Sequence, residues 1–287
     1  MNQVIDEIQV KALINLLEDT DEEIIHVVSE KLIECNISII PQLEKVWENS
    51  LNPVLQERIE NIIQEIQLRN VYIELRKWNL IGGKDILKGA YIIAKYQYPE
   101  INFNSIVDQI QKIKNDVWLE INSNLTALEK VRVINHIFYE IHKFSGNFSN
   151  YYSPYNYYIN QVLETRKGNP VTLGIIYITI AQWLELPIYG VNIPKNFLLA
   201  YKDTYATNDE NDILFYINPY NKGTVLGRKE IEFFLKQQKI KSDESFYKPC
   251  SNRIIIERLL LNIINSYEST GQIEKTSKFQ KLLSALK

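Results

Sequence analysis

Apolar residues recur every three or four positions through the first part of the chain, which is typical of amphipathic helices. They are Leu13, Leu16, Leu17, Ile24, Val27, Val28 and Leu32. The same theme returns about 30 residues later, an offset that is typical of helical repeats. The second set is Leu55, Ile59 and Ile63, and the polar turns LEDT and WENS separate the helices of each unit. The pattern predicts a HEAT-like helical region over 1–98.

Two further amphipathic helices are predicted at 105–121 and 125–144, after a polar junction that follows Pro99. The segment FSGNFSNYYSPYNYYINQVL then breaks the periodicity and holds five tyrosines between Tyr151 and Tyr158. A tyrosine cluster can form a platform for a sugar or a peptide. We interpret it instead as a long loop that packs its rings onto the domain.

A strongly apolar helix is predicted from Pro170 to Leu184. Asn169 suits the N-cap of this helix, and Pro170 suits its first position. Strand-like segments follow at 188–193, 197–201, 214–217 and 224–226, and then a helix at 228–238. The polar stretch 204–212 is expected to be a hairpin loop.

The last part of the chain, from Ser251, predicts two helices with Gly271 at the turn between them. Tyr267 before the turn and Phe279 after it resemble one tetratricopeptide-like helix pair. Such repeats need stacked neighbours to form a binding superhelix. We therefore expect a C-terminal hairpin that packs on the core, and we divide the chain into regions 1–98, 99–240 and 241–287.

Composition narrows the class of protein. A chain of 287 residues with 45% hydrophobic residues can bury a sizeable core. The net charge of −3 gives no basic footprint for nucleic acid. No run approaches the ~18 apolar residues of a membrane span. The start of the sequence lacks the features of a secretory signal, so we expect a bacterial cytoplasmic protein that binds neither nucleic acid nor membrane.

Cysteine and histidine are too few and too scattered to suggest a metal site. Cys35 and Cys250 are far apart and neither lies in a CxxC motif. The three histidines are His26, His136 and His142. We interpret both cysteines as reduced structural thiols and expect no cofactor.

A helix followed by antiparallel strands is nevertheless a known way to build a thiol site. The nucleophile stands at the helix N-terminus, where the dipole favours a thiolate. A base comes from one strand and its orienting partner from the next. The corresponding positions in this chain are Thr172, Asn196 and Asn218.

Three ordered blocks carry a resemblance to a family. ETRKGNPVTLG, LPIYGVNIPKNF and FYINPYNKG resemble the SirB1-like proteins of the transglutaminase-like superfamily, over about residues 105–287. The framework positions that fit the family pattern are Glu164, Arg166, Gly168, Pro170, Leu173, Leu186, Pro187, Gly190, Val191, Pro194, Phe197, Phe215, Pro219, Tyr220, Asn221 and Gly223. Of these, we assign Glu164, Arg166, Gly168, Pro170, Phe197, Pro219 and Tyr220 to the cleft and its framework, together with Lys195.

The resemblance implies a mostly helical α+β fold. It would have HEAT-like N-terminal helices, a transglutaminase-like (papain-like) core with a small antiparallel sheet, and a tetratricopeptide-like C-terminal hairpin. The family's Cys-His-Asp triad falls on Thr172, Asn196 and Asn218, and Lys195 replaces the glycine before the histidine. The departures therefore coincide with the catalytic positions, while the framework is kept.

Physical chemistry agrees with a loss of catalysis. A threonine hydroxyl needs an adjacent base to become a nucleophile, and asparagine does not accept a proton at neutral pH. Changing only the orienting aspartate of a serine protease to asparagine costs about 10⁴ in rate. We expect the three side chains to be satisfied by hydrogen bonds with each other or with the backbone, and Glu164 and Arg166 to form an ion pair.

Three hypotheses on function follow. The first is a non-catalytic transglutaminase-like protein that binds a protein or peptide through its cleft or its helical flanks. The second is an unusual amide-bond hydrolase or acyltransferase that uses Thr172, with a base supplied by His136, His142 or Lys195. The third is a structural or regulatory partner whose cleft has no function. We favour the first, because no base is evident.

Overall fold

The computed structural model describes residues 7–203 and 212–287. The predicted hairpin loop at 204–212 therefore lies almost entirely outside the described residues. The chain divides into two compact units, Met1–Glu74 and Leu75–Lys287. The division into three regions predicted from the sequence stays a prediction.

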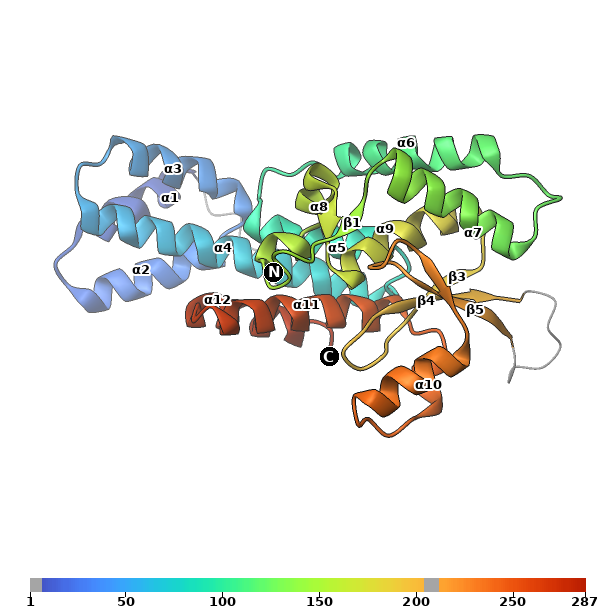
Figure 1. The fold of residues 1–287 in the computed structure, drawn as a ribbon. Coiled ribbons are helices and arrows are strands. Elements are labelled where there is room, and N and C mark those ends of the chain that lie inside the picture. Colours follow the sequence, from blue (N-terminus) through green and yellow to red (C-terminus); the bar gives the residue numbers. More distant parts are fainter. Residues whose placement is uncertain (1–6, 204–211) are drawn as a thin grey trace. The chain divides into compact units, whose positions relative to one another are not determined.

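The first unit consists of two helical hairpins (Figure 1). Their helices are α1 (Glu7–Asn15), α2 (Glu22–Glu34), α3 (Ile40–Asn49) and the first part of α4 (Pro53–Leu80). The predicted turn LEDT lies between α1 and α2, whereas WENS is mostly the last turn of α3, and only Ser50 lies in the connection to α4. Leu32 and Ile59 are fully buried, as the repeat predicted, but Ile24 is 39% exposed. The helical pattern is confirmed, while the HEAT-like assignment stays an interpretation.

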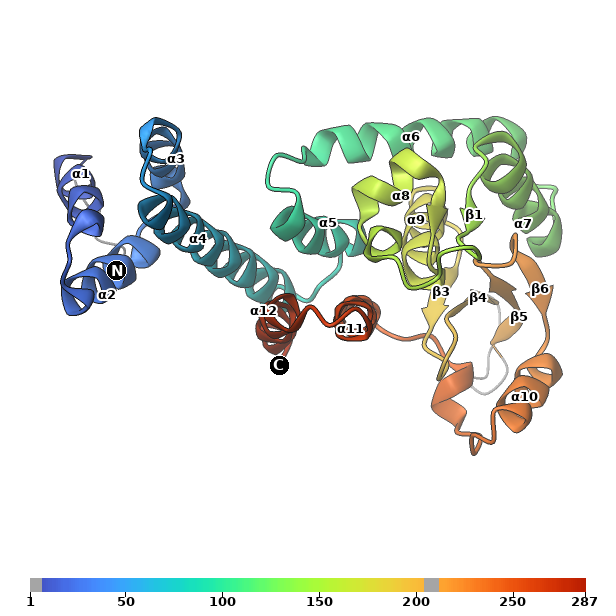
Figure 2. The same cartoon turned by 60° about the vertical axis from the view of Figure 1, so that its left-hand side comes forward.

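A buried helix, α9 (Pro170–Trp183), is the centre of the second unit. It is apolar on every side, which is the pattern of a helix enclosed by other elements. Around it lie other helices, α5 (Ile86–Gln97), α6 (Phe103–Glu120), α7 (Ala127–Asn135) and α8 (Ile159–Thr165) (Figure 2). The helix predicted over 125–144 ends as a π-helical turn, η3 (His136–Ile141).

A four-stranded antiparallel sheet lies between α9 and α10 (Arg228–Gln237). Its strands follow the order β3 (Ile188–Val191), β4 (Leu198–Lys202), β5 (Ile213–Asn218) and β6 (Thr224–Leu226). Leu198 and Ala200 pack with Ile231 and Leu235 of α10, while Leu199 faces α9. All four strands were predicted. The parallel pair β1 (Ser145–Gly146) and β2 (Lys167–Gly168) was not, because two residues show no periodicity.

The C-terminal hairpin packs on the core, as expected. It consists of α11 (Asn252–Ser269) and α12 (Ile273–Ser284), with Gly271 at a φ of 72° in the turn. The hydroxyls of Tyr158 and Tyr267 lie 2.9 Å apart in a hydrogen bond, and both side chains are buried. Phe279 stacks on Tyr267 at 5.6 Å between ring centroids. The fold is therefore a mostly helical α+β structure.

The Tyr158–Tyr267 hydrogen bond yields a stability prediction. Tyr158→Phe leaves the buried Tyr267 hydroxyl without this partner, so we expect the free energy of unfolding to fall by about 1–3 kcal/mol. The double variant Tyr158→Phe/Tyr267→Phe removes both polar groups and should recover most of that loss. Urea denaturation of the three proteins measures the effect. A double variant as unstable as the sum of two single variants would show that the bond is unimportant.

Candidate functional site

The N-terminus of α9 is built as the sequence predicted. Asn169 is the N-cap, and its Oδ1 accepts a hydrogen bond from the backbone N–H of Thr172 at 2.7 Å. Pro170 occupies the first helical position, where the missing N–H costs nothing. Thr172 thus has the place of a nucleophile at a helix N-terminus.

The side chain of Thr172 is completely buried. Its hydroxyl donates a hydrogen bond to the backbone carbonyl of Tyr157 at 3.4 Å. Tyr157 ends a short 3₁₀ turn, η4 (Pro154–Tyr157), in the tyrosine-rich segment. That segment therefore closes the nucleophile position with its own backbone. No sequence signal predicts this contact, because it is made by a carbonyl that every residue carries.

Buried asparagines fix the closing segment in place. The Asn156 carbonyl accepts a hydrogen bond from the N–H of Asn169 at 3.2 Å. The Asn156 side chain is 2% exposed, donates to the carbonyls of Asn150 and Tyr151, and accepts from Asn147. The segment is thus connected to the start of α9 both through Tyr157 and through Asn156.

The tyrosine rings divide into two groups. Tyr157 and Tyr158 are buried, which confirms the predicted packing onto the domain, and burial raises the pKa of Tyr157 to about 12. Tyr151, Tyr152 and Tyr155 are instead 43%, 65% and 60% exposed. For these three the packing prediction is wrong.

Asn196 lies at the end of a tight turn that leads into β4. Its N–H bonds to the Ile193 carbonyl at 3.1 Å, with Pro194 and Lys195 at the two central positions. Lys195 has a φ of 61°, so the turn has the arrangement of type II, which favours glycine at that position. The Asn196 Oδ1 accepts from the N–H of Phe197 at 2.8 Å. Its amide is therefore used to cap its own backbone.

Asn218 caps the turn after β5. Its Oδ1 accepts hydrogen bonds from the N–H groups of Tyr220 at 3.0 Å and Asn221 at 3.2 Å. This is a short-range bond of the kind that asparagine and aspartate both form in turns. Asparagine here consequently keeps the turn while carrying no charge.

The turn after β5 is held against the helices by buried polar contacts. Asn135 of α7 accepts from the Tyr177 hydroxyl at 3.0 Å and donates to the Gly223 carbonyl at 2.9 Å. Tyr139 of η3 donates to the carbonyl of the buried Pro219 at 2.9 Å. A Cβ on Gly223 would lie 2.0 Å from Asn135 Oδ1, and φ there is 68°. The roles of Asn135, Tyr139 and Tyr177 could not be predicted from the sequence, because they depend on the tertiary fold.

Several glycines lie so close to a neighbouring side chain that a larger residue would not fit. The ring of Phe197 lies between Gly174 and Gly190, where added Cβ atoms would come within 2.6 and 2.8 Å of it. Tyr220 approaches Gly146 in the same way, at 2.7 Å. At Gly168 an added Cβ would lie 2.9 Å from Val162. Gly168 and Gly190 of the family pattern, and Gly146 and Gly174 outside it, thus make room for aromatic and branched side chains.

The predicted ion pair between Glu164 and Arg166 does not form. Glu164 is exposed, and its carboxylate lies 3.5 Å from the Gln161 amide. The Arg166 guanidinium stacks over the Phe144 ring at 4.8 Å, and its buried Nη1 has no hydrogen-bond partner. Arg166 is in the left-handed conformation at the end of α8, which turns its side chain toward Phe144 rather than Glu164.

The groups considered as substitute bases are engaged elsewhere or exposed. His142 bonds to Asp116 of α6 at 2.7 Å, and His136 is exposed. The Lys195 ammonium lies 3.3 Å from the side-chain oxygen of Gln238, which follows α10.

The described residues offer neither a reactive thiol nor a metal site. Burial raises the pKa of the Cys250 thiol to about 11, so it is not a thiolate at neutral pH. Among the described residues, no group of three or more His, Cys, Asp and Glu is placed to hold a metal ion.

The topology brings the three candidate positions to the same end of the sheet. Asn218 ends β5, and Asn196 precedes β4, whose Leu199 pairs with Ile217. Phe197 packs on Gly174, two residues along α9 from Thr172. Between the described side chains of Thr172, Asn196 and Asn218, however, there is no hydrogen bond. Each is satisfied by the backbone, one of the two arrangements that we expected.

This geometry agrees with a comparison of the sequence with known families. The family model described as the Transglutaminase-like superfamily matches residues 104–261. The chain belongs to the transglutaminase-like superfamily. Its matched region runs from α6 through the sheet to the first half of α11, so it contains all three candidate positions.

Relatives of this transglutaminase-like chain occur in bacteria and animals. A UPF0162 protein of Xylella fastidiosa is 26% identical over 212 residues, 70% of this chain and 73% of that protein. F-box only protein 21 of Mus musculus is 30% identical over 209 residues, 64% of this chain and 33% of that protein. No solved structure matches the chain. In the described part of the chain, no helix is both long and apolar enough to cross a membrane.

The left-handed Lys195 gives a prediction for this transglutaminase-like core. Glycine adopts a positive φ without the cost of about 1 kcal/mol that a side chain brings. Lys195→Gly should therefore raise the free energy of unfolding by up to about 1 kcal/mol. Lys195→Ala, which keeps a Cβ and removes only an exposed contact, should change it little. If Lys195→Ala raised the free energy of unfolding as much as Lys195→Gly, the positive φ at this position would not be the source of the strain.

Proposed function

We propose that this protein is a non-catalytic, SirB1-like member of the superfamily that binds a protein or a peptide. The single observation that carries the proposal is the burial of Thr172, whose hydroxyl donates to the Tyr157 carbonyl. A nucleophile must reach its substrate, and this one is enclosed by the protein's own backbone. The absence of a base beside it in the described structure supports the same conclusion.

The alternative, an amide-bond hydrolase or acyltransferase that uses Thr172, would require two changes in the structure. The segment 154–157 would have to leave α9, which breaks the bonds from Thr172 and Asn169. A base would then have to approach, although His142 is engaged by Asp116 and Lys195 by Gln238. Asn196 and Asn218 offer amides that accept no proton at neutral pH.

The outer face of the closing segment is the surface that we assign to binding. We define the aromatic platform as the exposed rings of Phe148, Tyr151, Tyr152 and Tyr155, together with the half-buried ring of Tyr220 from the turn after β5. Ring contacts hold part of it together, since Tyr220 lies 4.5 Å from Phe148 and 5.9 Å from Tyr151 between centroids. Aromatic side chains offer a large contact area and lose little entropy on binding, which is why they are enriched in recognition surfaces.

The relatives support the use of this core as a module. In F-box only protein 21 of Mus musculus the similar region is 33% of the protein, so the core there is part of a longer chain. A cytoplasmic location, without nucleic-acid or membrane binding, belongs to the same proposal. The net charge of −3 supports the absence of nucleic-acid binding, because the chain has no basic excess to neutralise phosphates.

Pull-down from cells of the source organism tests the proposal with matched variants of the full chain. We expect partners captured by the wild type to be kept by Thr172→Ala, because the hydroxyl is buried and faces the backbone. They should be lost with Tyr152→Ala/Tyr155→Ala, which removes exposed rings, and circular dichroism should show both variants folded. An arginine at 172 would disrupt the core and is unsuitable for this purpose.

A parallel assay addresses catalysis. Wild type and Thr172→Ala should release no more ammonia or free amine from glutamine- and peptide-amide substrates than buffer does. Turnover by the wild type that disappears in Thr172→Ala would overturn the proposal in favour of the enzyme. Capture that is equal for wild type and the platform variant would move the binding surface elsewhere on the chain.

A further inference from the structure

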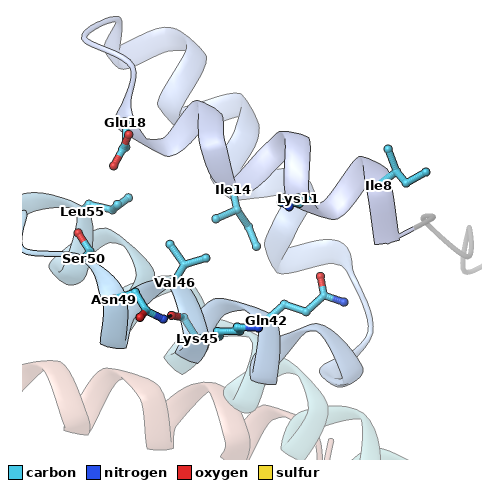
Figure 3. A pocket seen from close by; sticks show the side chains of 10 residues that line it. All are labelled: Ile8, Lys11, Ile14, Glu18, Gln42, Lys45, Val46, Asn49, Ser50 and Leu55. Atoms are coloured by element: carbon cyan, nitrogen blue, oxygen red, sulfur yellow. Dashed lines mark hydrogen bonds between the residues drawn. The ribbon is translucent and has the colours of Figure 1, made fainter.

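A groove runs along the first unit between two of its helices (Figure 3). It has a volume of about 760 Å³ and lies within Met1–Glu74. Its lining comes from α1 and the 3₁₀ turn η1 (Leu16–Glu18) after it, from α3 and Ser50 after it, and from the first turn of α4. The lining residues are Ile8, Lys11, Ile14, Glu18, Gln42, Lys45, Val46, Asn49, Ser50 and Leu55.

The floor of the groove is apolar. Ile14 and Leu55 are buried within the core of the unit, and Val46 is half-buried between them. Ile8 is 76% exposed and extends the apolar surface toward the start of α1. An apolar floor between two roughly facing helices is the shape that accepts a third helix through side chains at i, i+3, i+4 and i+7.

Charge is distributed unevenly around the groove. Lys11 of α1 and Lys45 of α3 line it from opposite walls. Glu18 lies at the end occupied by Leu55 and Ser50, whereas Lys11 lies toward Ile8 and Gln42 (Figure 3). Lys11, Lys45 and Glu18 are exposed, and none of them forms an ion pair with another described residue. The groove thus offers a basic end and an acidic end to a ligand.

We propose that this groove binds an amphipathic helix of a partner protein, with acidic residues in its first turns and basic residues in its last. The acidic turns would face Lys11 and Lys45, and the basic turn would face Glu18. That order of charges also suits the dipole of the bound helix itself. The helix would therefore run parallel to α1. This inference rests on the proposed binding function and gives it a second site and a partner class.

Selection from a phage-displayed library of randomised helical peptides of about 14 residues tests the groove. The bait is the full chain. We expect the enriched peptides to combine apolar residues at helical spacing with an acidic first half. The affinity of a synthesised winner, measured by fluorescence polarisation, should fall at least about tenfold on Lys11→Glu/Lys45→Glu. Val46→Asp should weaken it similarly.

Two controls make the result specific. Lys31→Glu reverses an exposed lysine on α2, outside the groove, and should leave the affinity unchanged. A peptide whose acidic residues are replaced by lysine should bind the Lys11→Glu/Lys45→Glu variant better than the wild type. Such a charge swap cannot come from loss of folding, which circular dichroism checks independently.

Several outcomes would overturn the inference. They are failure to enrich any helical peptide, winners without acidic residues, and affinities that the groove variants leave unchanged. Concentration-dependent dimers that Lys11→Glu/Lys45→Glu abolishes would assign the groove to a second copy of this chain. If Tyr152→Ala/Tyr155→Ala abolishes peptide binding and the groove variants do not, the groove inference fails while the proposed function stands.

Discussion

The hydrogen bond between the Thr172 hydroxyl and the Tyr157 carbonyl determines whether the nucleophile position of this protein is open or closed. It places the tyrosine-rich segment directly on the N-terminus of α9, where a transglutaminase-like enzyme would need an accessible nucleophile. Asn169 strengthens the arrangement, since it caps α9 through its side chain and bonds to Asn156 through its N–H. The same few atoms therefore start the central helix and close the site.

The rest of the site is consistent with this constraint. A buried hydroxyl needs only a hydrogen bond, whereas a buried charge would be costly without a partner. Asn196 and Asn218 are neutral, and each caps backbone N–H groups in its own turn. The glycines around Phe197 and Tyr220 leave room for these two rings in the core. The fold around the site is therefore satisfied without any charged group at positions 172, 196 and 218.

Much of the architecture could be predicted from the sequence because its signals are local. The N-cap at Asn169, the proline at position 170 and the four strands of the sheet follow from capping and alternation. The closing contact could not be predicted, because it uses a backbone carbonyl of Tyr157. The predicted ion pair between Glu164 and Arg166 is wrong, because the left-handed Arg166 directs its guanidinium to Phe144. Local patterns do not determine where such side chains meet.

Thiol labelling at position 172 tests the closed site most directly. Thr172→Cys in a background of Cys35→Ser/Cys250→Ser places a single thiol where the nucleophile would stand. Under native conditions we predict that a thiol reagent reacts with it far more slowly than with the unfolded chain, and that the rate rises with denaturant as the core unfolds. Native labelling as fast as in the unfolded chain would show an accessible site, and would contradict the account.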